Sequence, residues 1–133
     1  MFGFLKKKPD QTAVASEVTS NVLQIQLALA QATPQGLIAD NFALGYMFGF
    51  HDSLFQALGV DNDASGFATM VASYHRLCGN PSTGVRVLRR SLDLQSDHAF
   101  MKGMFSGGKE AVEWLNEKKI PMGLASHLQG SWD

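Results

Sequence analysis

Residues 45–59, with the sequence GYMFGFHDSLFQALG, are the most informative part of this chain. As a helix, this stretch is apolar around most of its circumference, whereas a helix at a protein surface carries one apolar stripe. It therefore predicts a buried helix at the centre of an all-α domain. The same stretch holds His51 and Asp52, the only histidine in the chain that an aspartate follows directly. This helix is the first place to look for a site.

Along the rest of the chain, the hydrophobic periodicity predicts a compact array of about five helices with short loops. The expected ranges are about 10–32, 37–58, 64–78, 81–94 and 97–118, with a short further helix around 124–129. Gly59 and Gly79 stand where helix ends favour glycine. Asp63 or Asn62 is expected to cap the third helix, and Ser96 or Asp97 the fifth.

Apolar residues recur every three or four positions in four of these helices, which is typical of helical faces. In the first helix they are Val14, Val18, Val22, Ile25 and Leu29, and in the third Phe67, Met70, Val71, Tyr74, Leu77 and Cys78. In the fourth helix Val85, Leu88 and Leu92 are expected to face inward, with Arg86, Arg89 and Arg90 outward. In the fifth the stripe is Met101, Met104, Phe105, Gly108, Val112 and Leu115.

Small residues form a second pattern in the central and fifth helices. Gly45 and Gly49 lie four apart, as do Gly103 and Gly107. Glycine inside a helix costs about 1 kcal/mol relative to alanine, so four of them need a compensating contact. We expect these two stripes to pack on each other at short axial distance. The alternatives are kinks, or a place where a ligand approaches the backbone.

The composition limits the classes of function. The chain has 133 residues, 45% of them hydrophobic and only 17% charged, with a net charge of -1. This length predicts one domain, and the low charge leaves weakly polar surface that favours self-association. The charge balance gives no reason to expect nucleic-acid binding. One cysteine, Cys78, cannot form an internal disulfide and fits a reducing, cytoplasmic compartment.

The chain begins with Phe2, Phe4 and Leu5, and three lysines follow at residues 6–8. We predict a flexible segment over residues 1–9 and a single helical domain over 10–133. The alternative for this segment is a weak peripheral membrane contact through residues 2–8, in which the lysines meet anionic headgroups. No apolar run is long enough to predict a membrane span.

Candidate chemistry centres on His51. A histidine on an apolar helix face is typically a core residue with one or two hydrogen bonds. The functional interpretation is a pocket near His51 and Asp52, and the candidate lining residues are Tyr46, His51, Asp52, Tyr74, His75 and Met104. The side chains of His51 and Asp52 diverge by about 100°, which argues against a catalytic dyad.

No motif identifies a reaction. The histidines lack metal-ligand spacing, and the glycine-rich residues 103–108 lack the lysine of a phosphate loop. We therefore expect neither a metal nor another cofactor. We expect Cys78 to be a core residue and not a nucleophile. The arginines at 86, 89 and 90 are a solvated helix face or, alternatively, a site for an anion.

These observations favour a non-enzymatic helical interaction or scaffold protein that associates with itself or with a protein partner. One alternative is a small-ligand-binding regulatory module with its pocket near His51 and Asp52. The second alternative is an enzyme that uses His51, Asp52, His75 and His98 as acid-base or metal groups.

Overall fold

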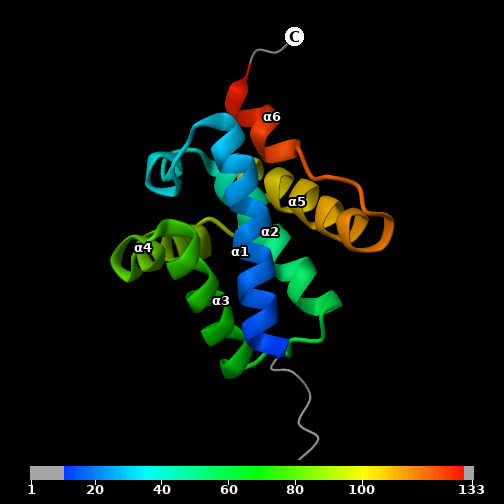
Figure 1. The fold of residues 1–133 in the computed structure, drawn as a ribbon. Helices are drawn as coiled ribbons and strands as arrows, with labels where there is room; N and C mark the ends of the chain where they lie inside the picture. Colours follow the sequence, from blue (N-terminus) through cyan, green and yellow to red (C-terminus); the bar gives the residue numbers. More distant parts are fainter. Residues whose placement is uncertain (1–10, 131–133) are drawn as a thin grey trace, which may run out of the picture.

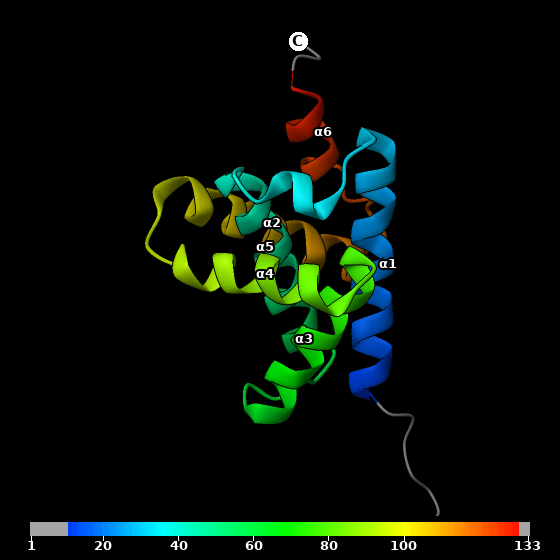
Figure 2. The same ribbon diagram turned by 90° about the vertical axis from the view of Figure 1, so that its left-hand side faces the viewer.

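The computed structural model describes residues 11–130, and in that range every regular element is helical. Figures 1 and 2 show the arrangement from two sides. The elements are α1 (Gln11–Ala30), the 3-10 turn η2 (Pro34–Leu37), α2 (Asn41–Ala57), α3 (Ala64–Cys78), α4 (Pro81–Asp93), α5 (His98–Glu117) and α6 (Gly123–Gln129). The all-α prediction is confirmed. No described helix is long and apolar enough to cross a membrane.

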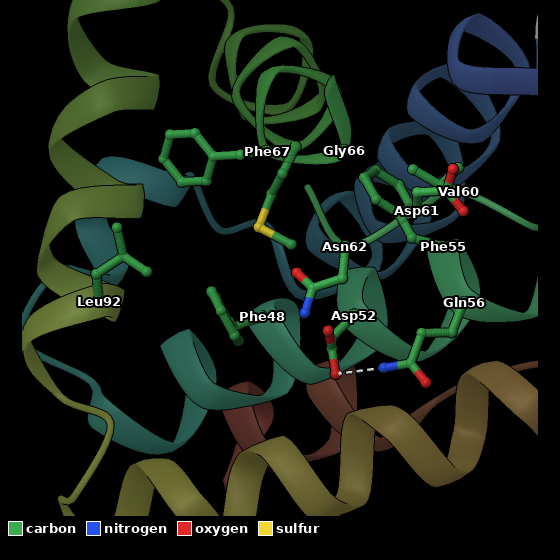
Figure 3. A pocket seen from close by; sticks show the side chains of 11 residues that line it. Phe48, Asp52, Phe55, Gln56, Val60, Asp61, Asn62, Gly66, Phe67 and Leu92 are labelled. Atoms are coloured by element: carbon green, nitrogen blue, oxygen red, sulfur yellow. Dashed lines mark hydrogen bonds between the residues drawn. The ribbon is translucent and has the colours of Figure 1, made fainter. Parts of the chain in front are cut away.

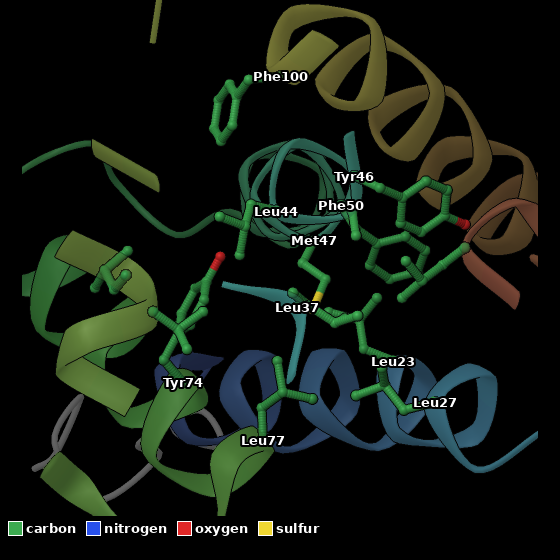
Figure 4. Packing of buried hydrophobic residues seen from close by; sticks show 14 of the residues in the cluster. Leu23, Leu27, Leu37, Leu44, Tyr46, Met47, Phe50, Tyr74, Leu77 and Phe100 are labelled. Atoms are coloured by element: carbon green, nitrogen blue, oxygen red, sulfur yellow. The ribbon is translucent and has the colours of Figure 1, made fainter. Parts of the chain in front are cut away.

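Helix α2 is the central element, as the apolar stretch predicts. It contacts α1, α4, α5 and α6, and residues all around its circumference are buried. Figure 4 shows Leu44, Met47 and Phe50 of α2 among apolar side chains from several other helices. The neighbours shown there include Leu23 and Leu27 of α1, Tyr74 and Leu77 of α3, and Phe100 of α5.

The start of α2 differs from the predicted position at residue 37. The helix begins at Asn41, and the Asp40 carboxylate accepts a hydrogen bond of 3.0 Å from the Ala43 amide. This side chain supplies an N-cap that the preceding residues lack, so the segment from Pro34 to Leu37 forms a separate 3-10 turn. The other predicted boundaries agree within a few residues, and Asp63 and Asp97 cap α3 and α5.

Helices α2 and α5 touch through their backbones along a glycine seam formed by Gly45, Gly49, Gly103 and Gly107. A Cβ atom built on Gly45 would overlap the carbonyl oxygen of Phe100, and one on Gly49 that of Met104. Reciprocally, a Cβ on Gly103 would overlap the carbonyl of Phe42, and one on Gly107 that of Tyr46.

The seam has a local two-fold pattern. Each glycine faces the carbonyl three residues before the matching glycine of the other helix. Cα–H groups that face carbonyl oxygens in this way form weak hydrogen bonds that need close backbone approach. The seam thus gives a physical reason for four glycines inside helices that would otherwise be weakened by them.

The inward face predicted for α4 is wrong at two of its three positions. In α4, Val85 is 47% exposed and Leu92 42%, while Val87 and Leu88 are buried. The stripe of α5 is turned outward as well, because the seam and Phe100 occupy its inner face. Its exposed members are Met101, Phe105 and Val112, of which Phe105 is 77% exposed.

Three of the five residues in the apolar stripe of α1 also face solvent. Ile25 is 57% exposed and Leu29 50%, and Val14 is exposed too. The face of α1 that packs on the protein carries smaller or polar side chains. These are Ala15, Ser16, Thr19, Ser20, Leu23, Gln26 and Leu27. The periodicity predicted the helix correctly, but the buried side is offset from the predicted stripe, of which only Val18 and Val22 are partly buried against the core.

Candidate functional site

His51 is a fully buried core residue. Its Nδ1 lies 2.7 Å from the carbonyl oxygen of Met47, and its Nε2 lies 2.8 Å from the Ser73 hydroxyl. Because a carbonyl can only accept, Nδ1 carries the proton and Nε2 accepts from Ser73. Both ring nitrogens are therefore occupied within the protein.

The surroundings of His51 favour its neutral form. Its ring stacks on Tyr74 at a centroid distance of 4.5 Å and meets the edge of Phe55 at 5.7 Å. Burial lowers the pKa of His51 from 6.5 to about 4, because the imidazolium would lose its hydration. A neutral, enclosed imidazole at neutral pH cannot exchange protons with a substrate.

The predicted pocket residues do not gather around one opening. Tyr46, His51 and Tyr74 are each 0% exposed, so none of them borders solvent. Asp52 points outward instead, and Met104 is partly buried against the core. The divergence predicted for His51 and Asp52 thus separates a core group from a surface group.

Tyr46 belongs to a buried polar network that ties four helices together. Its hydroxyl accepts a hydrogen bond of 2.9 Å from Gln26 and donates one of 2.5 Å to Glu110. The same Gln26 accepts from the amides of Leu124 and Ala125, and Glu110 accepts from the Gly123 amide. Burial raises the pKa of Tyr46, and the bond to Glu110 raises it further. The network satisfies the first turn of α6, so its role is structural.

We expect Tyr46→Phe to lower the free energy of unfolding by about 2 kcal/mol, because it leaves the buried amide nitrogen of Gln26 without its acceptor and removes the hydroxyl donor to Glu110. Tyr74→Phe is the matched control. The Tyr74 hydroxyl is buried and faces Ser91, but it makes no well-formed hydrogen bond within residues 11–130. That variant should match or exceed wild-type stability in urea denaturation. Equal losses in both variants would contradict the network.

An open pocket lies between α2, α3 and the end of α4, on the side to which Asp52 points (Figure 3). Its volume is about 210 Å³. The apolar part of the lining consists of Phe48, Phe55, Val60, Gly66, Phe67, Met70 and Leu92, and the polar part of Asp52, Gln56, Asp61 and Asn62. Both ionisable lining residues are acidic. We call this cavity the Phe67 pocket.

The sequence singled out Asp52 but none of the apolar side chains that form the Phe67 pocket. Phe67 belongs to the apolar stripe predicted for α3, yet it is 50% exposed at the pocket mouth. The pocket depends on the Val60–Asn62 loop, which brings the start of α3 beside α2. The close approach of Gly66 to the carbonyl of Asp61 fixes that loop, and no sequence period reports it.

The remaining candidates are scattered. His75 on α3 is half-buried, and His98 starts α5 in an exposed position. The arginines at 86, 89 and 90 are all exposed on α4. Burial raises the pKa of the half-buried Cys78 thiol to about 11, which makes it a poor nucleophile at neutral pH. In the described part of the chain, no three His, Cys, Asp or Glu side chains are grouped to hold a metal ion.

Comparison with known protein families, with curated proteins and with solved structures finds no match to this chain. Its function must therefore be argued from its own surfaces.

Proposed function

We propose that this protein is a non-enzymatic interaction module that associates with itself through the outward face of α1. The observation that carries the proposal is the exposure of Ile25 and Leu29 on a helix whose inner face is largely polar. Val14, Val18, Ile25 and Leu29 fall within an arc of about 60°, at 100° per residue. They form one stripe about 22 Å long, at 1.5 Å per residue.

The spacing of this stripe favours a second helix as its partner. Val18, Val22, Ile25 and Leu29 follow one another at intervals of four, three and four. This is the alternation by which helices pair in coiled coils. Val18 and Val22 are partly buried against the core, whereas Val14, Ile25 and Leu29 are exposed and lose their contact with water when another apolar helix covers them.

The charge pattern favours a second copy of this chain over a foreign helix. Positions that flank a helical seam select partners by their charges, and like charges repel in a self-pair. On the solvent side of α1 the positions beside Ile25 and Leu29 hold Asn21 and Ala28, both uncharged and exposed. Two identical α1 faces therefore meet without repulsion around Ile25 and Leu29, and the exposed Glu17, the only charged residue of α1, lies two helical turns before Ile25. The proposed compartment is cytoplasmic, in keeping with the single cysteine.

We expect the wild-type chain to sediment as a weak dimer with a dissociation constant in the micromolar range, because one helix face buries less than a standard interface. Ile25→Glu should raise that constant at least about tenfold, since it would place an unpaired carboxylate in the apolar contact. Sedimentation velocity between about 1 and 300 µM measures the dissociation constants of the wild-type chain and of the variant. The range brackets the micromolar constant expected for small interfaces.

Ile120→Glu is the matched control, because it makes the same substitution at a side chain that is 74% exposed outside α1. It should leave the dissociation constant unchanged. A wild-type monomer over the whole concentration range would refute self-association. Equal weakening by both variants would remove α1 from the interface.

A further inference from the structure

The Phe67 pocket has a chemistry of its own, separate from the face of α1. Its floor is apolar, and Phe67 and Leu92 remain partly open to solvent beside it. Figure 3 shows Phe48, Phe67 and Leu92 around the opening, with Asp52 on one side and its hydrogen bond to Gln56 drawn. The exposed carboxylates of Asp52 and Asp61 are the only charged groups in the lining. Such a site suits a segment in which apolar side chains precede cations.

This chain contains such a segment in residues 2–8. Two phenylalanines and a leucine are followed there by three consecutive lysines. These residues lie outside the described range, which begins at Gln11. The apolar side chains match the pocket floor in kind, and the lysines are opposite in charge to Asp52 and Asp61.

The start of α1 lies beside the pocket. Ala15, in the first turns of α1, packs on Phe55 and Val60, and both of these line the Phe67 pocket. An extended chain spans about 3.3–3.6 Å per residue, so the six residues from Gln11 back to Leu5 reach roughly 20 Å. That length exceeds the roughly 6 Å of helix from Gln11 to Ala15, where α1 packs on the pocket residues Phe55 and Val60.

We propose that residues 2–8 dock in the Phe67 pocket of their own chain. An apolar side chain among Phe2, Phe4 and Leu5 fills the cavity, and the lysines lie against Asp52 and Asp61. Because the segment is tethered, its effective concentration at the pocket is high and even a weak contact is populated.

The ε-methyl groups of methionine provide the test in the full-length chain. Met70 lines the pocket, Met47 is buried elsewhere in the core, and Met101 is exposed on α5. With ¹³C-methyl methionine, replacing Phe2, Phe4 and Leu5 together by serine should shift the Met70 signal and leave those of Met47 and Met101 in place. An unchanged Met70 signal overturns the proposal.

The charge contribution is tested with Asp52→Asn. We expect this variant to move the Met70 signal toward its position in the triple-serine chain, through an approximately two- to fivefold loss of the docked population. Glu117→Gln removes an exposed carboxylate at the far end of α5 and serves as the control. Equal effects of the two variants would overturn the assigned contact.

Two further outcomes identify other partners and would overturn docking in the same chain. A Met70 shift that disappears on dilution assigns the segment to a second copy. A Met70 signal indifferent to the serine variant, combined with flotation of only the wild-type chain with phosphatidylserine-containing vesicles, assigns residues 2–8 to a membrane surface. No residue of the α1 stripe lines the pocket, so Ile25→Glu should leave the Met70 methyl signal unchanged. This expectation separates the docking test from the test of self-association.

Discussion

Gly107→Ala should destabilise the protein by about 3 kcal/mol or more and lower its melting temperature by roughly 10 °C. The added methyl group would overlap the carbonyl oxygen of Tyr46 and would lie 2.9 Å from its carbonyl carbon. Both are backbone atoms, so the clash can be relieved only by moving α5 away from α2. That movement would open the seam along its whole length.

Gly108→Ala is the control for this variant. Its added methyl group would meet the Ser53 hydroxyl at 2.6 Å, and a side-chain oxygen can rotate away. The gain of about 1 kcal/mol in helix propensity offsets that adjustment, so the variant should stay within about 1 kcal/mol of wild type. Differential scanning calorimetry of the Gly107→Ala and Gly108→Ala variants measures the difference between their melting temperatures. Similar melting temperatures would show that the helix backbones are not in contact.

Acidification from pH 6.5 to pH 4 should remove about 3 kcal/mol of stability through His51 alone. The folded protein holds this imidazole at a pKa of about 4, whereas the unfolded chain titrates it near 6.5. Between these values the unfolded state binds one more proton, so the free energy of unfolding falls as the pH falls. The free energy of unfolding changes through this group by about 1.4 kcal/mol per pH unit. The stability that depends on a neutral His51 is fully present above pH 6.5.

The variant His51→Phe isolates this contribution. It keeps an aromatic ring between Tyr74 and Phe55, and it frees the Ser73 hydroxyl to donate to the Ser16 carbonyl, which lies 3.3 Å away. Urea denaturation at several pH values should give a pH dependence that is shallower by the expected slope. A native-state His51 signal that titrates near 6.5 in an NMR experiment would contradict the burial of this ring.

The sequence predicted the helices better than their orientation. Side chains such as Asp63 and Asp97 cap their own helices, so local signals locate helix ends. Which face of a helix is buried depends instead on how all the helices pack together. In α5 the glycine seam requires the small residues to face α2, which turns Phe105 outward although its spacing is typical of a core face. A close backbone contact therefore prevailed over the larger apolar stripe.

In the candidate site, too, local geometry could be predicted from the sequence and contacts between distant segments could not. That His51 and Asp52 diverge follows from helix geometry and could be predicted. The partners of His51 could not, because Ser73 lies on another helix with no pattern to mark it. The Phe67 pocket likewise joins α2, a loop, α3 and α4, and only their packing brings these residues together.

The glycine seam also constrains how the chain folds. It joins α2 to α5, which are separated in sequence by the whole of α3 and α4. The intervening pair can form early from local contacts, because α3 and α4 pack directly on each other. The seam must instead close a long loop, and it loses the entropy of that loop before any backbone contact offsets it. Formation of the seam is therefore the step expected to set the folding rate.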